Sequence, residues 1–471
     1  MSRFSFYSWL AAAGLLAAGA GASAQEQLAI KGGRIIPIGK PPVENGVILI
    51  RDGKVQAVGG KDLPIPADYK VIDAAGKVVM PGFIEAHSSR GMDQANERNN
   101  NVPFLSVVDA IDPGQEYFED CLRNGVTTVA IVPAEATMIG GQAAVIKTAG
   151  TYVEQMIVKR HAGIKISLRP TDGRSRMSHL AALRKELDGA RDALQDQLSR
   201  PKAAAAAPAR KPVAPGPEKA IGGTGVPPVG EPTQPEPPSG GGTPGGAAQG
   251  QGDAAARREA LLRLLRAEMP AFIYCDAAMD VPQALKLVKE YKLKAVLVLG
   301  HNCYKAAKLV AASKLPVILG PTLVFWETDA RSGEDRKIIL PKIYREAGVP
   351  LTFQVTGMAG GNLFRAPDLP ATLGSNFLWY QAATAVKYGM PKAEALEAIT
   401  LRPAKLLGID ALAGSIEPGK DADLVILTGD PLKLTTWVQT TLVRGKVVYE
   451  RDKDRKLRQL LPAGKETVNA R

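Results

Sequence analysis

The chain has 471 residues, of which 45% are hydrophobic, so it can bury the core of a large α/β barrel or of several smaller domains. Its formal net charge is +12 at pH 7, but lysine and arginine are spread along the chain and aromatic residues make up only 5%. Nucleic-acid interfaces combine a concentrated basic patch with aromatic side chains, so we expect no nucleic-acid partner.

The cysteine content excludes a small disulfide-stabilised fold. Only Cys121, Cys275 and Cys303 are present, and an odd number leaves at least one free thiol. Cys275 and Cys303 follow consecutive predicted strands and could pair if their Cα atoms lie within about 7 Å. The favoured interpretation is that they are buried apolar thiols.

Residues 1–24 have the pattern of a secretory signal peptide. Arg3 lies near the start, an apolar run continues from Leu10 to Ala20, and the small residues Ala22-Ser23-Ala24 precede Gln25. The run is too short to span a bilayer, so cleavage is favoured over an uncleaved anchor. We expect an exported protein, periplasmic or secreted, with no stable membrane span after cleavage.

The two ends of the mature chain, residues 25–77 and 413–450, are predicted to be β-structure. Short apolar runs alternate with turns, and Asp52-Gly53 has the composition of a hairpin turn. The predicted strands are Leu28–Lys31, Arg34–Ile38, Gly46–Ile50 and Val55–Val58 at one end, with Gly414–Leu427 and Thr441–Tyr449 at the other. A polar tail, residues 451–471, follows.

Between the two ends, strands alternate with helical stretches, which is typical of a (β/α)₈ barrel. Residues 78–199 would form its first half and residues 253–412 its second. The predicted strands are Val78–Ala86, Val126–Val132, Ala143–Thr148, Ile164–Leu168, Ala271–Cys275, Ala295–Leu299, Pro316–Leu319 and Pro350–Val355. Predicted helices include Gln283–Lys289, Tyr304–Ala312 and Phe377–Tyr388.

Residues 200–252 interrupt the barrel. They are rich in proline, alanine and glycine and have almost nothing to bury, so we expect a disordered insertion between helical stretches near 177–198 and 253–268. The insertion lies in the connection from the fourth strand to the fifth. Such loops lie on the catalytic face of a barrel, but a tolerated surface excursion is the preferred explanation.

Two motifs identify a family resemblance. The run from Pro81 to His87, Pro-Gly-Phe-Ile-Glu-Ala-His, resembles the opening barrel strand of the amidohydrolase superfamily, in particular its imidazolonepropionase-like and prolidase-like members. The run from Glu417 to Leu424 resembles the tail segment of that superfamily. The resemblance implies a TIM-type (β/α)₈ barrel with a composite β-sandwich built from both chain ends. It also implies a hydrolase that acts on carbon–nitrogen bonds of a small molecule.

The resemblance also implies a site for one or two divalent metals, with zinc as the first expectation. In the family the first strand ends His-x-His, because side chains at i and i+2 of a strand point the same way. Here His87 occupies the first position, but Ser89 occupies the second. On the fourth strand Lys165 matches the family's carbamylated lysine, and Lys147 on the third strand is a second candidate. A strand-end lysine that reaches solvent is the alternative for both.

The remaining family positions are only partly kept. Tyr274 or Asp276 stands where the fifth strand should supply a histidine, whereas His301 keeps the ligand position on the sixth. After the eighth strand, Thr356 or Gly357 replaces the aspartate that accepts a proton from metal-bound water.

The other polar residues do not repair these losses. The chain has four histidines, and His161 and His179 lie off the expected ligand positions. Arg176 could bind a substrate carboxylate, although a surface arginine is the commoner case. Tyr274 and Asp276 are the other candidates for substrate binding.

Two hypotheses follow. The first is an exported amidohydrolase that cleaves a carbon–nitrogen bond in a small cyclic or N-acyl substrate, with His87, Lys165 and His301 as metal ligands. The second is a non-catalytic relative that keeps the barrel for binding or assembly and needs no metal. The ligand count favours loss of the metal-dependent mechanism. The expected partner in either case is a small molecule, and a homo-oligomer remains open.

Overall fold

The computed structural model describes residues 27–171, 173–199, 245–355 and 377–460. The predicted signal peptide, residues 200–244 of the predicted insertion, Thr356, Gly357 and residues 461–471 lie outside the described residues. The last part of the predicted insertion differs from expectation, because helix α4 already begins at Gly245 and continues to Leu265. No helix in the described ranges is both long and apolar enough to cross a bilayer.

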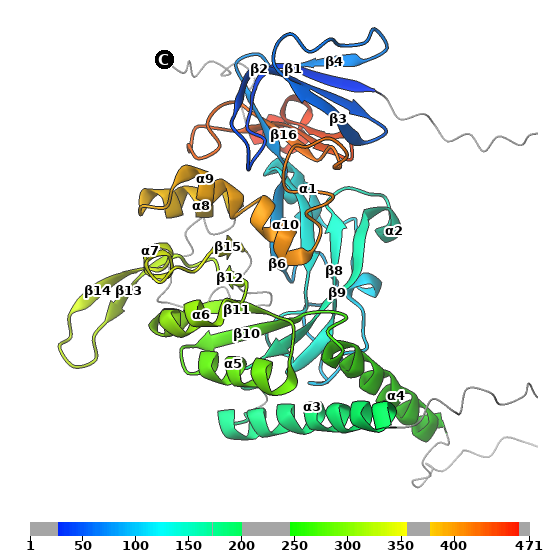
Figure 1. The fold of residues 1–471 in the computed structure, drawn as a ribbon, viewed down its shortest axis with the longest axis vertical. Helices are drawn as coiled ribbons and strands as arrows, with labels where there is room; N and C mark the ends of the chain where they lie inside the picture. The colour runs from blue at the N-terminus through cyan, green and yellow to red at the C-terminus, as the bar shows by residue number, and fades with distance from the viewer. Residues whose placement is uncertain (1–26, 172, 200–244, 356–376, 461–471) are drawn as a thin grey trace, which may run out of the picture.

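Strands from both chain ends share one eight-stranded sheet, drawn in blue and red in Figure 1. Its hydrogen-bonded order is β18-β17-β16-β5-β1-β2-β3, and β4 pairs with β1. The junction between the two chain ends is the antiparallel pair β5 and β16, in which Met80 lies opposite Val425. The strands are β1 Leu28–Ile35, β2 Val43–Arg51, β3 Lys54–Gly59, β4 Lys70–Asp73, β5 Val78–Pro81, β16 Leu424–Leu427, β17 Val438–Val443 and β18 Lys446–Glu450.

The predicted hairpin turn between β2 and β3 is confirmed. Asp52 and Gly53 both have positive φ, at 51° and 76°. Both residue types tolerate the left-handed region, which a two-residue hairpin loop requires.

The middle of the chain forms a second eight-stranded sheet that is nearly closed. Its order is β15-β12-β11-β10-β9-β8-β7-β6. The backbone N–H of Val355, just after β15, donates to Glu85 Oε1 on β6 at 3.3 Å, which brings the two edges of the sheet together. The strands are β6 Phe83–Ser88, β7 Val126–Ile131, β8 Ile139–Lys147, β9 Ile157–Ser167, β10 Ala271–Ala277, β11 Ala295–Asn302, β12 Val317–Leu319 and β15 Leu351–Phe353.

The third strand departs from the regular (β/α)₈ pattern. The predicted strands are present in chain order, but the first, Val78–Ala86, is divided: β5 Val78–Pro81 belongs to the other sheet, and the barrel strand β6 begins at Phe83. In addition, β8 runs antiparallel to both β7 and β9. Residues 132–138, which connect β7 to β8, are too few for the crossover of a dozen or more residues that a parallel pair requires. A short hairpin connection is therefore used, and the prediction of eight uniformly alternating β/α units is wrong at this point.

Helices cover the outside of the barrel sheet. The three predicted helices are confirmed as α5, the run of η3 and α6, and α8. The helices described besides α4 are α1 Glu116–Arg123, α2 Val153–Met156, α3 Arg176–Ser199, α5 Asp280–Tyr291, α6 Ala307–Ser313, α7 Leu340–Glu346, α8 Leu378–Lys387, α9 Lys392–Glu397, α10 Leu401–Leu407 and α11 Arg455–Leu460. Short 3₁₀ turns are η1 Val107–Asp109, η3 Cys303–Ala306 and η5 Arg451–Lys453, and a separate hairpin consists of β13 Val324–Thr328 and β14 Asp335–Ile339.

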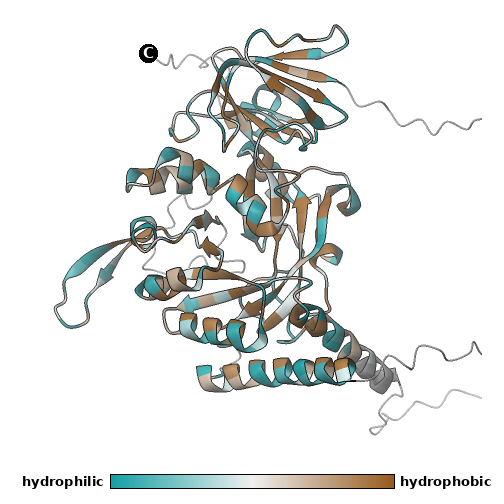
Figure 2. Ribbon diagram, viewed as in Figure 1, coloured by the Kyte–Doolittle hydropathy of each residue, from teal (hydrophilic) through white to brown (hydrophobic). Residues whose placement is uncertain are grey.

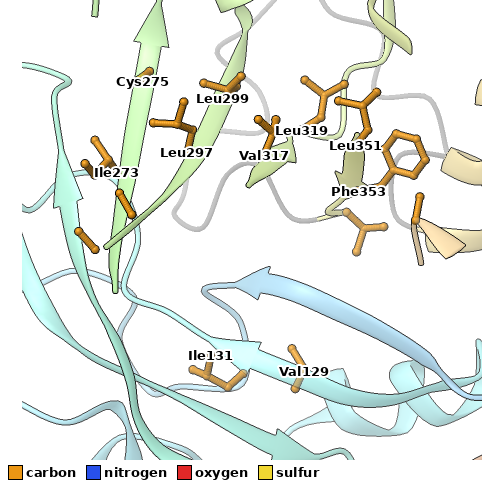
Figure 3. Close-up of a cluster of buried hydrophobic side chains, with 14 of the residues drawn as sticks. Val129, Ile131, Ile273, Cys275, Leu297, Leu299, Val317, Leu319, Leu351 and Phe353 are labelled. Carbon is orange, nitrogen blue, oxygen red and sulfur yellow. The ribbon is translucent and has the colours of Figure 1, made fainter. Parts of the chain in front are cut away.

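The two faces of the barrel strands belong to different hydrophobic clusters. Leu297, Leu299 and Phe353 lie in the cluster of Figure 3, which also contains Val281 and Leu287 of α5 and therefore faces the helices. The alternate residues Val296 and Val298 belong to a second cluster on the inner face, together with Ile84 and Phe272. Figure 2 shows the same pattern as hydrophobic strands covered by helices of mixed hydropathy. All three cysteines are free and buried, as the sequence predicted.

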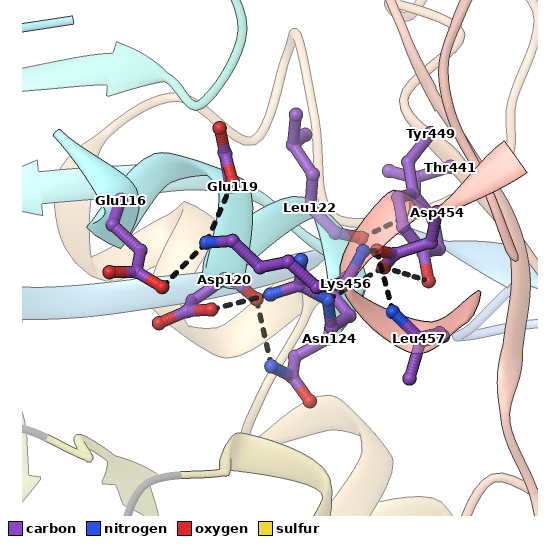
Figure 4. A network of polar contacts seen from close by, with 11 residues as sticks. Glu116, Glu119, Asp120, Leu122, Asn124, Thr441, Tyr449, Asp454, Lys456 and Leu457 are labelled. Carbon is purple, nitrogen blue, oxygen red and sulfur yellow. Dashed lines mark hydrogen bonds and ion pairs between the residues drawn. The ribbon is translucent and has the colours of Figure 1, made fainter. Parts of the chain in front are cut away.

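The first part of the predicted polar tail packs against the barrel. Lys456 Nζ contacts Glu116 Oε1 at 2.6 Å and Glu119 Oε2 at 3.1 Å, both on α1 (Figure 4). Arg123 Nε donates to Asp454 Oδ2 at 2.8 Å. The start of the tail is thus held to α1 by the ion pairs of Asp454 and Lys456.

Candidate functional site

A β-bulge in β6 sets the direction of His87. The register between β6 and β7 shifts between Glu85 and Ser88. The Tyr117 hydroxyl on α1 lies 3.1 Å from Glu85 Oε2 and 2.9 Å from Ser88 Oγ, so both residues face the outer helix. His87 instead lies against Lys165 of β9, across the inside of the barrel. A bulge inserts an extra residue into the strand and so interrupts the alternation of side chains between the two faces. His87 can therefore point into the barrel although strict alternation would place it on the outer face.

Lys165 is the centre of a buried polar group at the carboxyl end of the barrel. Its side chain is 0% exposed, and its Nζ lies 3.2 Å from His87 Nε2 and 3.4 Å from Glu135 Oε1. The Tyr274 ring centroid lies 5.2 Å from the same nitrogen. Burial lowers the pKa of Lys165, and the Glu135 carboxylate partly opposes this effect.

His87 is held neutral in this group. Burial, and then the charge of Lys165, lowers its pKa well below the usual value. An ammonium group can only donate, so Nε2 must be the acceptor and Nδ1 must carry the proton. The nearby Gln354 opposes the lowering of the His87 pKa, yet neither Gln354 Oε1 nor His87 Nδ1 has a partner with full hydrogen-bond geometry in the described part of the chain.

Sequence reasoning missed Glu135 and Gln354. Glu135 lies in the hairpin connection after β7, and Gln354 directly follows β15. Their signal was their place in the chain, because polar residues just after barrel strands gather at the carboxyl end. Neither position carries a residue of the family's metal-ligand pattern, so that pattern did not reveal them.

Tyr274, Asp276 and His301 form a more exposed group at the same end. The Tyr274 hydroxyl donates to Asp276 Oδ1 at 3.1 Å, and burial followed by the Asp276 charge raises the pKa of Tyr274. Burial lowers the pKa of His301, and Asp276 opposes it. The His301 ring packs edge-on against Phe325 with centroids 5.0 Å apart. Because Tyr274 lies over Lys165 and donates to Asp276, it joins this group to the buried one.

Arg176 is placed in a structural contact. Its Nε donates to Asp280 Oδ1 at 2.9 Å, which ties the start of α3 to the start of α5. The same carboxylate also accepts the backbone N–H groups of Asp276 and Ala277 at 3.0 and 2.9 Å. Arg176 therefore acts through Asp280 on the backbone that carries Asp276.

Lys147 lies at the opposite end of the barrel from Lys165. It is 0% exposed and forms ion pairs with Asp423 and, at 3.1 Å, with Asp421 Oδ2. The antiparallel direction of β8 places its last residue beside Thr128 at the amino end of the barrel, so Lys147 cannot serve the site as the second candidate lysine. His179 also lies outside the site, because its Nε2 bonds the Ser167 carbonyl at 2.9 Å.

The donor set does not fit the family's metal centre. The described residues contain no group of three or more His, Cys, Asp or Glu side chains arranged to hold a metal ion. Ser89, and Tyr274 or Asp276, stand where the resemblance implies histidine ligands, and a hydroxyl is a poor substitute for imidazole. The Nε2 lone pair of His87 already accepts from a buried lysine.

Comparison with known proteins finds an amidohydrolase domain in the C-terminal part of the chain. The model of the Amidohydrolase family matches residues 295–448. An adenine deaminase from Listeria monocytogenes is 32% identical over 119 residues, which are 25% of this chain and 17% of the deaminase. A dihydroorotase from Geotalea daltonii is 35% identical over 111 residues, 22% of this chain and 21% of that protein. Each match thus spans less than a quarter of the relative's length.

A solved structure covers far more of the chain. The amidohydrolase from Thermotoga maritima MSB8 superposes with a TM-score of 0.69 and 25% identity, over 90% of this chain and 100% of that one. The family model covers the chain from β11 to the C-terminal strands, and the superposition extends the likeness to both sheets. Residues 295–448 therefore carry an Amidohydrolase family domain, and the chain as a whole has the fold of a solved amidohydrolase.

Proposed function

We propose that the protein binds a small nitrogen-containing molecule at the carboxyl end of its barrel and has lost metal-dependent hydrolysis of carbon–nitrogen bonds. The observation that carries the proposal is the 3.2 Å contact between Lys165 Nζ and His87 Nε2. A histidine binds a metal through a free nitrogen lone pair, and here a buried ammonium group occupies that lone pair. The same positive charge also opposes the approach of a second cation.

The chemistry of the site supports binding. His87 Nδ1 can donate and Gln354 Oε1 can accept, and both atoms are buried without a bonded partner among the described residues. Such unpaired polar atoms are costly unless a ligand or water meets them. Tyr274, Asp276 and His301 add a half-buried rim of further donors and acceptors. The relatives named adenine deaminase and dihydroorotase suggest the ligand class, a small molecule with a reactive carbon–nitrogen bond.

The architecture and localisation complete the proposal. We infer that the sheet built from both chain ends is the composite β-sandwich of the superfamily, supported by one hydrophobic cluster that joins Ile30, Ile48 and Val79 to Leu424 and Leu442. The sequence pattern of residues 1–24 supports export from the cell.

A second candidate is a hydrolase with a reduced metal site. It is favoured by the position of Lys165, which lies beside His87 at the end where the family's carbamylated lysine bridges its metals. Carbamylation would convert the lysine from a cation into an anion and release the lone pair of His87. In that case His87, the modified Lys165 and His301 would hold a divalent metal, which would supply a polarised water.

Metal content separates the two candidates. The mature protein is expressed in medium supplied with zinc, manganese and iron, purified and measured by elemental analysis beside a His87→Ala/His301→Ala variant. We expect equal, low metal content in both. A Ser89→His/Tyr274→His variant, which restores two family ligands, should bind more metal than either. Near one metal per chain in the natural protein, lost in the double alanine variant, would overturn the proposal in favour of the hydrolase.

A further inference from the structure

A cavity of about 470 Å³ lies at the amino ends of β12 and β15. Its wall includes Pro316 and Val317 at the start of β12, Pro350 just before β15, and Leu406 of α10. His87 and Gln354 lie at the carboxyl ends of their strands, so the cavity opens at the other end of the barrel from the site described above. Its volume is within the range of small-molecule pockets in proteins.

The charged side chains in the wall of this cavity are all basic. Three basic residues, Lys314, Arg402 and Lys405, contribute to its wall, and no aspartate or glutamate does. Arg402 is fixed in place, because its Nη1 donates to the Leu351 carbonyl at 2.7 Å, and Glu397 approaches its Nη2 at 3.5 Å. Lys314 and Lys405 are exposed and have no ion-pair partner in the described part of the chain.

The rest of the wall is apolar except at one point. Val310, Leu315 and Val349 give hydrophobic contact surface. Thr352, only 1% exposed, also lines the cavity. It stands between Leu351 and Phe353, which both face the outer helices, so its side chain faces the barrel interior and it adds a polar residue to the wall of the cavity.

We propose that this cavity is a second binding site and that it takes a small amphipathic anion, with a carboxylate or sulfonate head group and an apolar body. The three basic residues attract the head group, and the apolar wall removes the body from water. This inference is independent of the proposed function, because it uses no residue of the site around Lys165.

The test uses the mature full-length protein and the fluorescent anion 8-anilinonaphthalene-1-sulfonate, with octanoate as competitor. We expect one bound probe per chain, displaced by octanoate but not by 1-octanol at the same concentration. The neutral alcohol has the same apolar body without the charge, so it separates charge recognition from adsorption to any hydrophobic surface.

Variants place the binding in this cavity. Lys314→Gln/Lys405→Gln should weaken octanoate binding roughly fivefold, since exposed ion pairs each contribute modestly. Ala311→Trp, which fills the cavity from α6, should abolish it. Lys308→Gln removes one lysine charge from α6 outside the cavity wall and should leave affinity unchanged. The proposal would be overturned if all three variants bound octanoate as tightly as the natural protein, each with an unaltered circular dichroism spectrum. Failure of octanoate to displace the probe would also overturn it.

Discussion

Burial acts in the same direction on His87 and Lys165, since it lowers the pKa of both groups. The two residues nevertheless differ in charge. Lys165 has the Glu135 carboxylate at 3.4 Å to compensate an ammonium, whereas His87 faces a cation and must remain neutral. The Glu135 carboxylate therefore favours the proton on Lys165 over His87, and in this way it sets the charge of the site.

The neutral state of His87 predicts a pH dependence of stability. Below about pH 6.5, His87 is protonated in the unfolded chain but stays neutral in the folded chain. Lowering the pH in that window therefore reduces the free energy of unfolding by up to about 1.4 kcal/mol per pH unit. Replacing His87 with Gln removes this contribution. We expect the free energy of unfolding, measured by urea titration between about pH 7.5 and pH 5, to fall less steeply in His87→Gln than in the natural protein.

His161→Gln is the matched control, because the pKa of His161 is also lowered by burial but its side chain is far less enclosed. Its slope should lie close to that of the natural protein. Identical slopes for His87→Gln and the natural protein would show that His87 is not held neutral by the fold.

Among the elements, β9 carries Lys165 and is closely packed at Gly163. At Gly163 on this strand, a Cβ atom would lie 2.5 Å from the Phe272 ring and 2.7 Å from the Pro270 carbonyl oxygen. A backbone oxygen cannot move aside as a side chain can. We expect Gly163→Ala to lower the free energy of unfolding by about 1–3 kcal/mol, as overpacking does in other cores.

Gly189 in α3 is the control, since a Cβ there meets nothing within 4 Å. Gly189→Ala should raise the free energy of unfolding by about 0.5–1 kcal/mol, because alanine favours a helix over glycine. Chemical denaturation of both variants gives the comparison, and a loss of equal size at both positions would contradict the packing argument.

The sequence predicted which segments are strands but not the direction of each. The apolar runs that became β7, β8 and β9 are bounded by turn residues, which suffices to locate a strand. A run of apolar residues does not encode parallel or antiparallel pairing. The connection length does, and residues 132–138 were too few for a crossover. His87, Lys165, Tyr274 and His301 were predicted as strand-end residues, whereas the contact of Lys165 with His87 depends on the bulge at Glu85, which no local pattern reveals.

At the scale of the whole molecule, a buried ion pair joins the two sheets. Lys147 at the end of β8 meets Asp421 and Asp423 just before β16. Burial alone would raise the pKa of Asp421, but the Lys147 charge and hydrogen bond lower it, so Asp421 stays ionised at neutral pH. Asp423 also accepts the Arg444 backbone N–H at 2.9 Å. The lysine thus fixes the loop before β16 and the turn before β18 against the barrel.

Breaking this link should be costly. Lys147→Met leaves two carboxylates without their buried cation, and we expect a loss of about 3–5 kcal/mol in the free energy of unfolding. Lys305→Met is the control, because Lys305 is 56% exposed and its pair with Glu327 should contribute no more than about 1 kcal/mol. Urea titrations of both variants measure the two free energies of unfolding. Similar decreases would show that the buried ion pairs of Lys147 stabilise the fold no more than the exposed pair of Lys305.

The pairing of β5 with β16 also has a consequence for how the chain is made. These two strands come from opposite ends of the sequence, so closing the loop between them is delayed until nearly the whole chain has been synthesised. The β7-β8-β9 meander, with its local contacts, can form much earlier. Until β16 emerges, the edge of β5 has unpaired backbone groups, and a nascent chain in that state is open to strand addition by another copy. Truncation before β16 should therefore yield aggregates rather than a smaller folded barrel.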